Sequence, residues 1–352
     1  MARTHSDEKP DLVPQLKADL KNGTLGNFYV FYGEEAYLRE YYLNRLNEAV
    51  AEGPAADFNV HRFSAETLTP EALSDAVESM PMMAERTLVR VDDVDFFKLN
   101  ETLREQYLSI FSDIPDWCIL VLAYDTVEYK LNKTMKRLAD VFTKKAQAVE
   151  FRKQSEHDLA DWIRKHFAAH GRQVSTDLCK YLIFLTDGSM SLLGSEIEKI
   201  AHYASGTEIQ KSDIDAVASP VLNAQTFDIS NAIADGSYEK ALQKLQDLFA
   251  MQTDPLLILG AIGSQLRRML YARALMSEGK GQQALCELTG MKPYAAGLTV
   301  SAARKVSDRF CERAMEILLE TDEQIKRSFS DPEQLLEVLI ARLALEAGHA
   351  SV

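Results

Sequence analysis

The spacing of apolar residues changes character near residue 152. Before that point, short apolar runs alternate with segments in which apolar residues recur every three or four positions. The runs predict strands and the periodic segments predict helices. Because strands separated by helices are typical of βαβ units, we expect a parallel sheet covered by helices on both faces. The predicted strands are 28–32, 57–63, 87–91, 118–123 and 148–151, and the predicted helices are 11–20, 34–49, 70–80, 100–111 and 131–142.

Beyond residue 152 the pattern predicts helices only. Ser155, with Asp158 three residues later, is typical of a capping box, and Ser307 is placed to cap a later helix. Asp254-Pro255 and Asp331-Pro332 each put an N-cap side chain before a proline at the first helical position. The predicted helices are 155–169, 176–185, 189–204, 212–218, 227–236, 238–251, 255–276, 307–326 and 332–346.

The fold class that follows is an α/β domain and then two all-α domains. With 352 residues the chain is too long for one ordinary core. The change of pattern places the first boundary, and Ser219-Pro220 places the second. We therefore expect domains at residues 1–152, 153–220 and 221–352.

A helix, a turn with two methionines and a short strand follow one another between residues 71 and 93. Pro81 lacks an amide donor and disfavours helix at the residue before it, so the helix should end at Met80. Met82 and Met83 then occupy the turn, where they either pack under the sheet edge or face outward toward a partner's pocket. The apolar positions of the helix are Leu73, Ala76, Val77 and Met80, and those of the strand are Leu88, Val89 and Val91.

A single glycine, Gly33, separates the first strand from the next helix. A phosphate-binding loop occupies this place in nucleotide-binding α/β domains, but the pattern G-x-x-x-x-G-K-[ST] is absent. Glu34 and Glu35 stand at the helix start, where carboxylates favour the helix dipole and repel a triphosphate. We therefore predict a degenerate phosphate loop and no cofactor. The predicted apolar face of this helix is Leu38, Tyr41, Tyr42, Leu46 and Ala49.

Two other patterns resemble metal sites. Asp92-Asp93 follows a hydrophobic strand, as a Walker B magnesium site does, and His166 and His170 have the i, i+4 spacing of a zinc pair. Without a phosphate loop, and without a Glu after His166 as in H-E-x-x-H, we expect no metal at either place.

Composition and charge narrow the class of protein. Hydrophobic residues make up 46% of the chain and charged residues 26%, which is typical of a folded protein. We expect a cytoplasmic location without membrane association, because no apolar run is long enough to span a bilayer and the N-terminus lacks a signal-peptide core. The four cysteines are far apart and favour reduced, buried thiols. A net charge of −14 argues against tight autonomous DNA binding.

A family resemblance extends over nearly the whole chain. A degenerate nucleotide-binding domain followed by helical domains resembles a clamp-loader subunit of the AAA+ class. The chain is more closely similar to the delta-subunit family of bacterial DNA polymerase III. The matching stretches are 31–38, 79–86, 194–199, 227–233, 240–242, 258–260 and 266–268.

The resemblance implies a role in DNA replication. Members of this family bind the sliding β-clamp and open its ring so that it can be loaded on primed DNA. They act in a pentameric loader whose other members hydrolyse ATP, and the implied partners in the loader are the ATPase subunits and delta-prime. The chain would then be a component of the DNA-directed DNA polymerase III holoenzyme, a nucleotidyltransferase complex, without catalysis of its own.

The resemblance also assigns roles to residues. The family's clamp-binding pair of bulky apolar residues matches Met82 and Met83, with Met80 and Pro81 shaping the step. The family's pair commonly includes an aromatic residue, and here both are methionine. The small helical domain would be a lid, and the C-terminal helices would form the collar that joins the subunits. No Ser-Arg-Cys sequence occurs, so we expect no arginine finger.

DNA contact is expected, if anywhere, near the end of the helix at 307–326. Lys326, Arg327 and Phe329 combine positive charge with an aromatic ring, which suits contact with a DNA strand. A solvated helix end accounts for the same residues equally well.

Two functions of other classes remain open. An active P-loop ATPase would bind nucleotide, which the missing lysine and the two glutamates oppose. A structural scaffold would assemble through the C-terminal helices without contacting a clamp.

Overall fold

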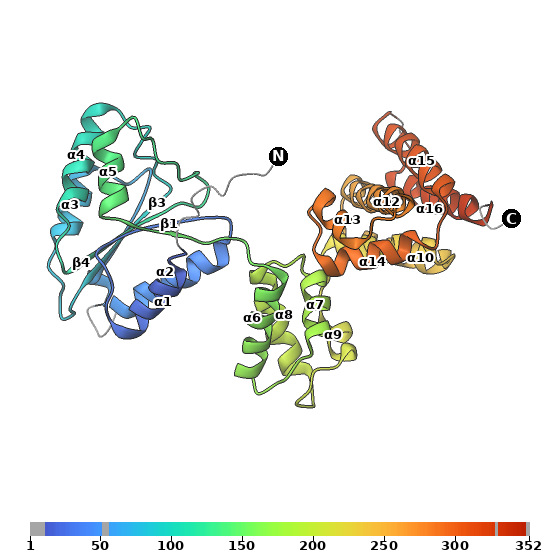
Figure 1. Ribbon diagram of the computed structural model, residues 1–352, viewed down its shortest axis with the longest axis horizontal. Helices are drawn as coiled ribbons and strands as arrows, with labels where there is room; N and C mark the ends of the chain where they lie inside the picture. The colour runs from blue at the N-terminus through green and yellow to red at the C-terminus, as the bar shows by residue number, and fades with distance from the viewer. Residues whose placement is uncertain (1–10, 51–55, 328–329, 350–352) are drawn as a thin grey trace. The chain divides into compact units, whose positions relative to one another are not determined.

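The computed structural model describes residues 11–50, 56–327 and 330–349 and divides the chain into two compact units, residues 1–154 and 155–352. The first unit is α/β and the second is built of helices (Figure 1). The predicted boundary near residue 152 lies close to this division. The further boundary at residue 220 stays a prediction.

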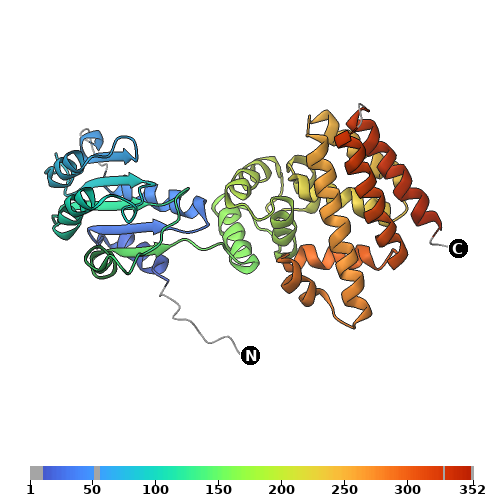
Figure 2. The ribbon, with the colours of Figure 1, turned by 90° about the horizontal axis from the view of Figure 1, so that it is seen from above.

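A five-stranded sheet forms the centre of the first unit, and all of its strand pairs are parallel. The strand order is β2-β3-β4-β1-β5, and Figure 2 shows the strands running side by side. The strands are β1 (Phe28–Tyr32), β2 (Val60–Ser64), β3 (Thr87–Asp92), β4 (Cys118–Ala123) and β5 (Gln147–Glu150). The predicted α/β class with a parallel sheet is confirmed.

Helices cover both faces of this sheet. One face carries α3, α4 and α5, which pack rings such as Phe111 and Phe142 onto Phe28. The other face carries α1 and α2, which pack Leu16 and Leu46 onto the sheet. The helices are α1 (Val13–Asn22), α2 (Ala36–Val50), α3 (Pro70–Glu78), α4 (Glu101–Ser112) and α5 (Lys136–Lys144).

The clearest departures from the prediction in this unit are the starts of two elements and the buried face of a third. Residues 57–59 belong to a 3₁₀ helix, η1 (Ala56–Asn59), and not to a strand, because Phe58 is exposed instead of facing the core. Helix α5 starts five residues late, because the Asn132 side chain accepts hydrogen bonds from Thr134 and stabilises a turn there. The buried face of α2 is also rotated: Tyr41 and Ala49 are exposed, and its buried residues are Arg39, Tyr42, Leu43, Leu46 and Val50.

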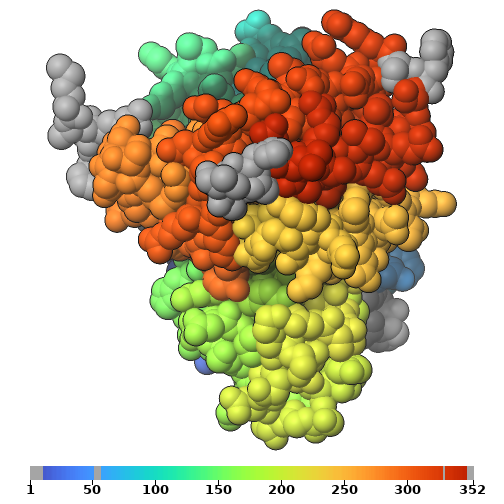
Figure 3. Space-filling view, turned by 90° about the vertical axis from the view of Figure 1, so that its right-hand side faces the viewer, coloured from blue at the N-terminus to red at the C-terminus, as the bar shows by residue number. Residues whose placement is uncertain are grey.

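The second unit contains eleven helices within the described residues. Figure 3 shows those of its last part packed against one another in space-filling form. Their shared core includes Ile262, Phe310 and Leu339. The helices are α6 (Glu156–Ala169), α7 (Thr176–Leu185), α8 (Met190–Tyr203), α9 (Lys211–Val217), α10 (Leu222–Ala234), α11 (Tyr238–Ala250), α12 (Pro255–Ser277), α13 (Gln282–Thr289), α14 (Pro293–Ala303), α15 (Asp308–Arg327) and α16 (Pro332–His349).

Several predicted helix ends are confirmed by capping contacts. The Ser155 hydroxyl accepts a hydrogen bond from the Asp158 amide, and Asp254 accepts from the first amides of α12. Ser307 accepts from the Phe310 amide at the start of α15. Helices α13 and α14 were not predicted, although Gly290 in a left-handed conformation and Pro293 at a helix start mark their junction.

The cysteines fit the expectation of buried thiols. All four are free, and Cys118, Cys179 and Cys311 are buried. Burial raises the pKa of each of these three to about 11, so they stay protonated at neutral pH. Among the described helices, none is long and apolar enough to cross a membrane.

Candidate functional site

The glycine loop, residues 33–35, lies at the carboxyl end of β1. This strand is flanked by β4 and β5, whereas the chain continues from α2 to β2 at the far edge of the sheet. Open parallel sheets usually bind ligands at such a point, outside the carboxyl ends of the strands. The loop therefore occupies the position where a nucleotide site is expected.

The backbone of the glycine loop is closed onto Phe151. Gly33 has φ +122°, and a Cβ atom built there would lie 2.4 Å from the carbonyl oxygen of Phe151. The Phe151 amide donates to the Tyr32 carbonyl over 2.7 Å, and the Glu35 amide donates to the Phe151 carbonyl over 2.9 Å. The Glu35 amide, which lies where a phosphate-binding loop would donate to a phosphate, therefore already donates to an acceptor inside the protein. Glu34 and Glu35 directly precede α2, which begins at Ala36, and the Glu35 carbonyl accepts from the Arg39 amide, so the two carboxylates stand at the helix start as predicted.

Arg39 holds the loop from within the unit. Its side chain is 2% exposed, its Nη1 donates to the Gly33 carbonyl over 2.8 Å, and its Nη2 pairs with Asp125. A buried guanidinium stays charged and needs such acceptors. The Arg39 cation therefore binds the protein's own oxygens.

The two aspartates that resemble a Walker B site also have partners within the protein. Asp93, at φ +55°, accepts hydrogen bonds from the amides of Asp125, Thr126 and Val127 and from the Thr126 hydroxyl. Burial raises the pKa of Asp93, but these hydrogen bonds outweigh it, so the pKa lies below its ordinary value. Asp92 pairs with Arg62 and Arg90.

The described part of the chain holds no group of three potential ligands among His, Cys, Asp and Glu. One nitrogen of His166, Nδ1, lies 2.8 Å from the Trp162 carbonyl of the preceding turn.

The methionine loop, residues 79–86, joins α3 to β3. Helix α3 ends at Glu78, two residues earlier than predicted, because Ser79 is already extended. Met80 therefore lies outside the apolar stripe of the helix and is 76% exposed. Met82 is 51% and Met83 82% exposed, so neither packs under the sheet edge. The alternative in which both belong to the core is wrong.

Two contacts fix the backbone of this loop. The side chain of Asn59 is fully buried; its Oδ1 accepts from the Met82 amide over 2.6 Å and its Nδ2 donates to the Met82 carbonyl over 2.9 Å. Farther along, Arg86 donates to the Leu25 carbonyl over 2.6 Å. Between these points Met83 adopts φ +55°, a left-handed conformation that is uncommon for a residue with a side chain. Exposed apolar side chains are thus carried by a defined backbone.

A hollow of about 590 Å³ lies beside the loop. Met83 and Arg86 stand at one side of it, and the ends of α1 and α2 form the other. Its lining residues are Leu20, Gly23, Leu25, Ala49, Val50, Met83, Ala84, Glu85, Arg86 and Ile119.

Two family models match the chain. One, described as DNA polymerase III, delta subunit, matches residues 29–152, and the other, the C-terminal domain of the same subunit, matches residues 223–343. The chain belongs to the DNA polymerase III delta subunit family. The first match contains both the glycine loop and the methionine loop.

Relatives of this family cover almost the full chain. DNA polymerase III subunit delta of Bacillus subtilis is 25% identical over 92% of this chain and 94% of its own. The probable DNA polymerase III subunit delta of Aquifex aeolicus is 24% identical over 90% and 91%. The solved structure of the Bacillus subtilis DNA clamp loader delta protein matches with a TM-score of 0.60 and 23% identity, over 95% of this chain and 99% of that one. This likeness shows the fold.

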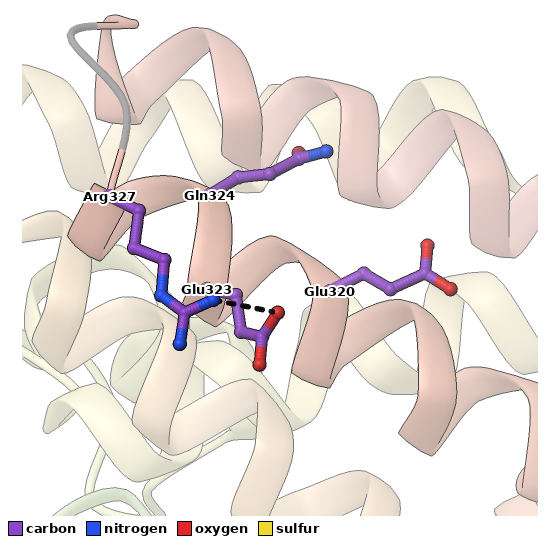
Figure 4. A pocket seen from close by; sticks show the side chains of 4 residues that line it. All are labelled: Glu320, Glu323, Gln324 and Arg327. Carbon is purple, nitrogen blue, oxygen red and sulfur yellow. Dashed lines mark ion pairs between the residues drawn. The ribbon is translucent and has the colours of Figure 1, made fainter.

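The residues suggested for DNA contact lie at the end of α15. Lys326 and Arg327 are exposed, but each pairs with an acidic residue one turn earlier, Asp322 at 2.7 Å and Glu323 at 3.8 Å. Figure 4 shows Arg327 turned toward Glu323 in a shallow pocket that also contains Glu320 and Gln324. These carboxylates would repel a phosphate. Phe329 lies outside the described residues.

Pattern reasoning missed the residues that support the two loops of this delta-family chain. Asn59 stands in a stretch that resembles a strand, and Arg39 stands on a face that was assigned to apolar residues. Asn59 binds the backbone of Met82, and Arg39 binds the Gly33 carbonyl and the Asp125 carboxylate. Asn59 and Met82, and likewise Arg39 and Asp125, are far apart in sequence and become neighbours only in the folded protein. The sequence held one usable signal: Arg39 is the single charged residue on the helix face that otherwise carries apolar residues.

Proposed function

We propose that this chain is the delta subunit of the DNA polymerase III clamp loader and that it binds and opens the sliding β-clamp. Family membership supports a role in the clamp loader. The observation that carries the proposal is the exposure of Met82 and Met83 on a backbone held by Asn59. Neighbouring exposed methionines on a fixed loop provide an adaptable apolar contact for a partner's pocket.

The mechanism is a shift of population. The ring opens if the subunit binds the open ring more tightly than the closed ring. The equilibrium between the two forms shifts by no more than the difference between these two binding free energies. Burial of each methionine in a clamp pocket would supply about 1.5–3 kcal/mol. That burial counts most if the two side chains anchor a hot spot at the centre of the contact.

ATP hydrolysis belongs, in this proposal, to other subunits of the loader. The glycine loop offers a closed backbone and an internally paired arginine where a nucleotide would bind. We therefore assign no cofactor and no catalysis to this chain. Its partners would be the sliding clamp, the ATPase subunits, delta-prime and, within the complex, primed DNA. The acidic neighbours of Lys326 and Arg327 make a direct DNA contact there the weakest part of the proposal.

The test is a titration of the full chain with the sliding clamp of the same organism, without nucleotide. The Met82→Ala/Met83→Ala variant should weaken binding roughly 100- to 10,000-fold, because about 3–6 kcal/mol of burial is lost. Its melting temperature should change by less than about 2 °C, because both side chains are exposed. Met251→Ala, which removes another methionine that is 63% exposed, is the matched control.

The outcomes separate the three candidate functions. Unchanged affinity in the folded double variant would place the clamp contact elsewhere. If the wild type does not bind, the titration is repeated with the loader's other subunits and ATP, and failure there would leave the scaffold function. Saturable nucleotide binding by the isolated chain would favour the ATPase.

A further inference from the structure

Met83 in the methionine loop has a strained backbone conformation that contacts of its own side chain do not stabilise. Met83 is 82% exposed and has φ +55°. A left-handed conformation at a residue with a Cβ atom persists only when its surroundings enforce it. Because the Met83 side chain is mostly in solvent, the enforcing contacts must act on the backbone.

The contacts that act there come from Asn59. The Met82 carbonyl belongs to the peptide group that joins Met82 to Met83, and the φ angle of Met83 is measured against that peptide group. The hydrogen bond from Asn59 Nδ2 to this carbonyl therefore restricts the rotation that sets φ. The second bond, from the Met82 amide to Asn59 Oδ1, fixes the peptide before it.

The position of Asn59 makes it a rigid support. Asn59 is 0% exposed and lies at the junction of η1 and β2, which pairs with β3 in the sheet. The loop leads directly into β3, so both ends of the contact are attached to the same pair of strands. A buried amide with donor and acceptor both satisfied is costly to displace.

We infer that Asn59 is the positioning residue of the methionine loop, which holds Met82 and Met83 in the geometry that binds the clamp. This inference rests on the proposed function and names the residue that prepares its contact. A loop fixed before binding loses less conformational entropy on binding, and so binds more tightly, than a loop that must be ordered.

The experiment is a double-mutant cycle on the full chain, read as the Kd for the sliding clamp. Asn59→Ala should raise Kd about tenfold, because about 1.4 kcal/mol, part of the net strength of the two hydrogen bonds, is then needed to order the loop on binding. In the Met82→Ala/Met83→Ala background the same substitution should change Kd less than twofold, because it acts through those side chains. A merely structural role would give equal losses in both backgrounds.

A matched control separates positioning from general destabilisation. Thr69 caps the start of α3 by accepting from the Ala72 amide, at the opposite end of the helix from the methionine loop. Thr69→Ala should lower the melting temperature and leave Kd unchanged. Loss of clamp affinity in Thr69→Ala equal to that in Asn59→Ala would overturn the inference.

A measurement on the wild type tests the inference even if Asn59→Ala does not fold. The Met82 amide should exchange with solvent at least tenfold more slowly than the amides of Met83, Ala84 and Glu85, since it alone of these donates to a buried acceptor in the described structure. Equal exchange rates would overturn the inference. If the wild type does not bind the clamp even with the loader's other subunits and ATP, the proposed function fails, whereas clamp binding that Asn59→Ala leaves unchanged refutes only the inference.

Discussion

The glycine loop and the methionine loop belong to the same sheet and use their residues in opposite ways. In the glycine loop, the amide of Glu35, the carbonyl of Gly33 and the guanidinium of Arg39 all have partners inside the protein. In the methionine loop, internal partners fix the backbone and leave the apolar side chains in solvent. The glycine loop lies where a ligand is expected, yet internal contacts occupy its polar groups. The methionine loop lies between a helix and a strand, and it presents the exposed apolar side chains that a partner protein could contact.

The largest effect that tests this contrast is expected at Gly33. Gly33→Ala should destabilise the first unit by about 3 kcal/mol or more, because it adds a Cβ atom against the Phe151 backbone in a conformation open mainly to glycine. Thermal unfolding of the full chain measures it. Gly23→Ala is the control, since Gly23 has φ +71° with no heavy atom within 4 Å of an added Cβ, and should cost about 1 kcal/mol. Equal tolerance of both substitutions would mean that the glycine loop is open and adaptable.

A smaller effect is expected at Asp93. Asp93→Asn keeps a residue that tolerates a left-handed backbone but removes the charge, and should cost about 1 kcal/mol at pH 7. Because the pKa of Asp93 is lowered in the folded protein, its stabilisation is present above the ordinary pKa and is lost as pH falls through the folded value. The difference between wild type and variant should therefore be constant from pH 7 to about pH 5 and shrink below about pH 4.

Denaturant unfolding at several pH values measures this difference, and Asp75→Asn, at an exposed carboxylate on α3, is the control. A difference that grows on acidification would contradict the assigned hydrogen bonds.

The smallest effect is expected from nucleotide. Millimolar Mg-ATP should change the melting temperature of the isolated chain by less than about 1 °C, because the Glu35 amide and the Arg39 guanidinium at the glycine loop already have partners. A ligand present at 100 times its Kd would stabilise by about 2.7 kcal/mol and shift the melting temperature by several degrees. A melting temperature that rises with Mg-ATP concentration and saturates would show that the glycine loop binds nucleotide, and the two loops would then no longer differ in being closed or open to a ligand.

The parts of the fold that were predictable depend on neighbours in sequence. The continuous apolar runs at 28–32 and 118–123 coincide residue for residue with β1 and β4, because central parallel strands are buried on both faces. The caps at Ser155 and Asp254 were predictable for the same reason, since a cap acts on the next turn. The place of the methionines in a turn followed from Pro81.

The supports of the candidate site were not predictable, because they join residues that are distant in sequence. Asn59 binds Met82 across 23 positions, and Arg86 reaches Leu25 across 61. Helical periodicity identified the general face of α2 but gave no reason to place a charged residue on it. Arg39 is buried there because Gly33 and Asp125 supply its acceptors, and only the folded sheet brings them together.

The choice of two methionines for the exposed pair has a chemical consequence. A thioether in solvent is readily oxidised to the sulfoxide, which converts a flexible apolar side chain into a polar one and is reversed by dedicated reductases. Met83 is 82% exposed and Met82 51%, so both side chains face the solvent that carries such oxidants. A phenyl ring in the same place would not respond. A partner contact built from these two side chains would therefore be weakened by their oxidation.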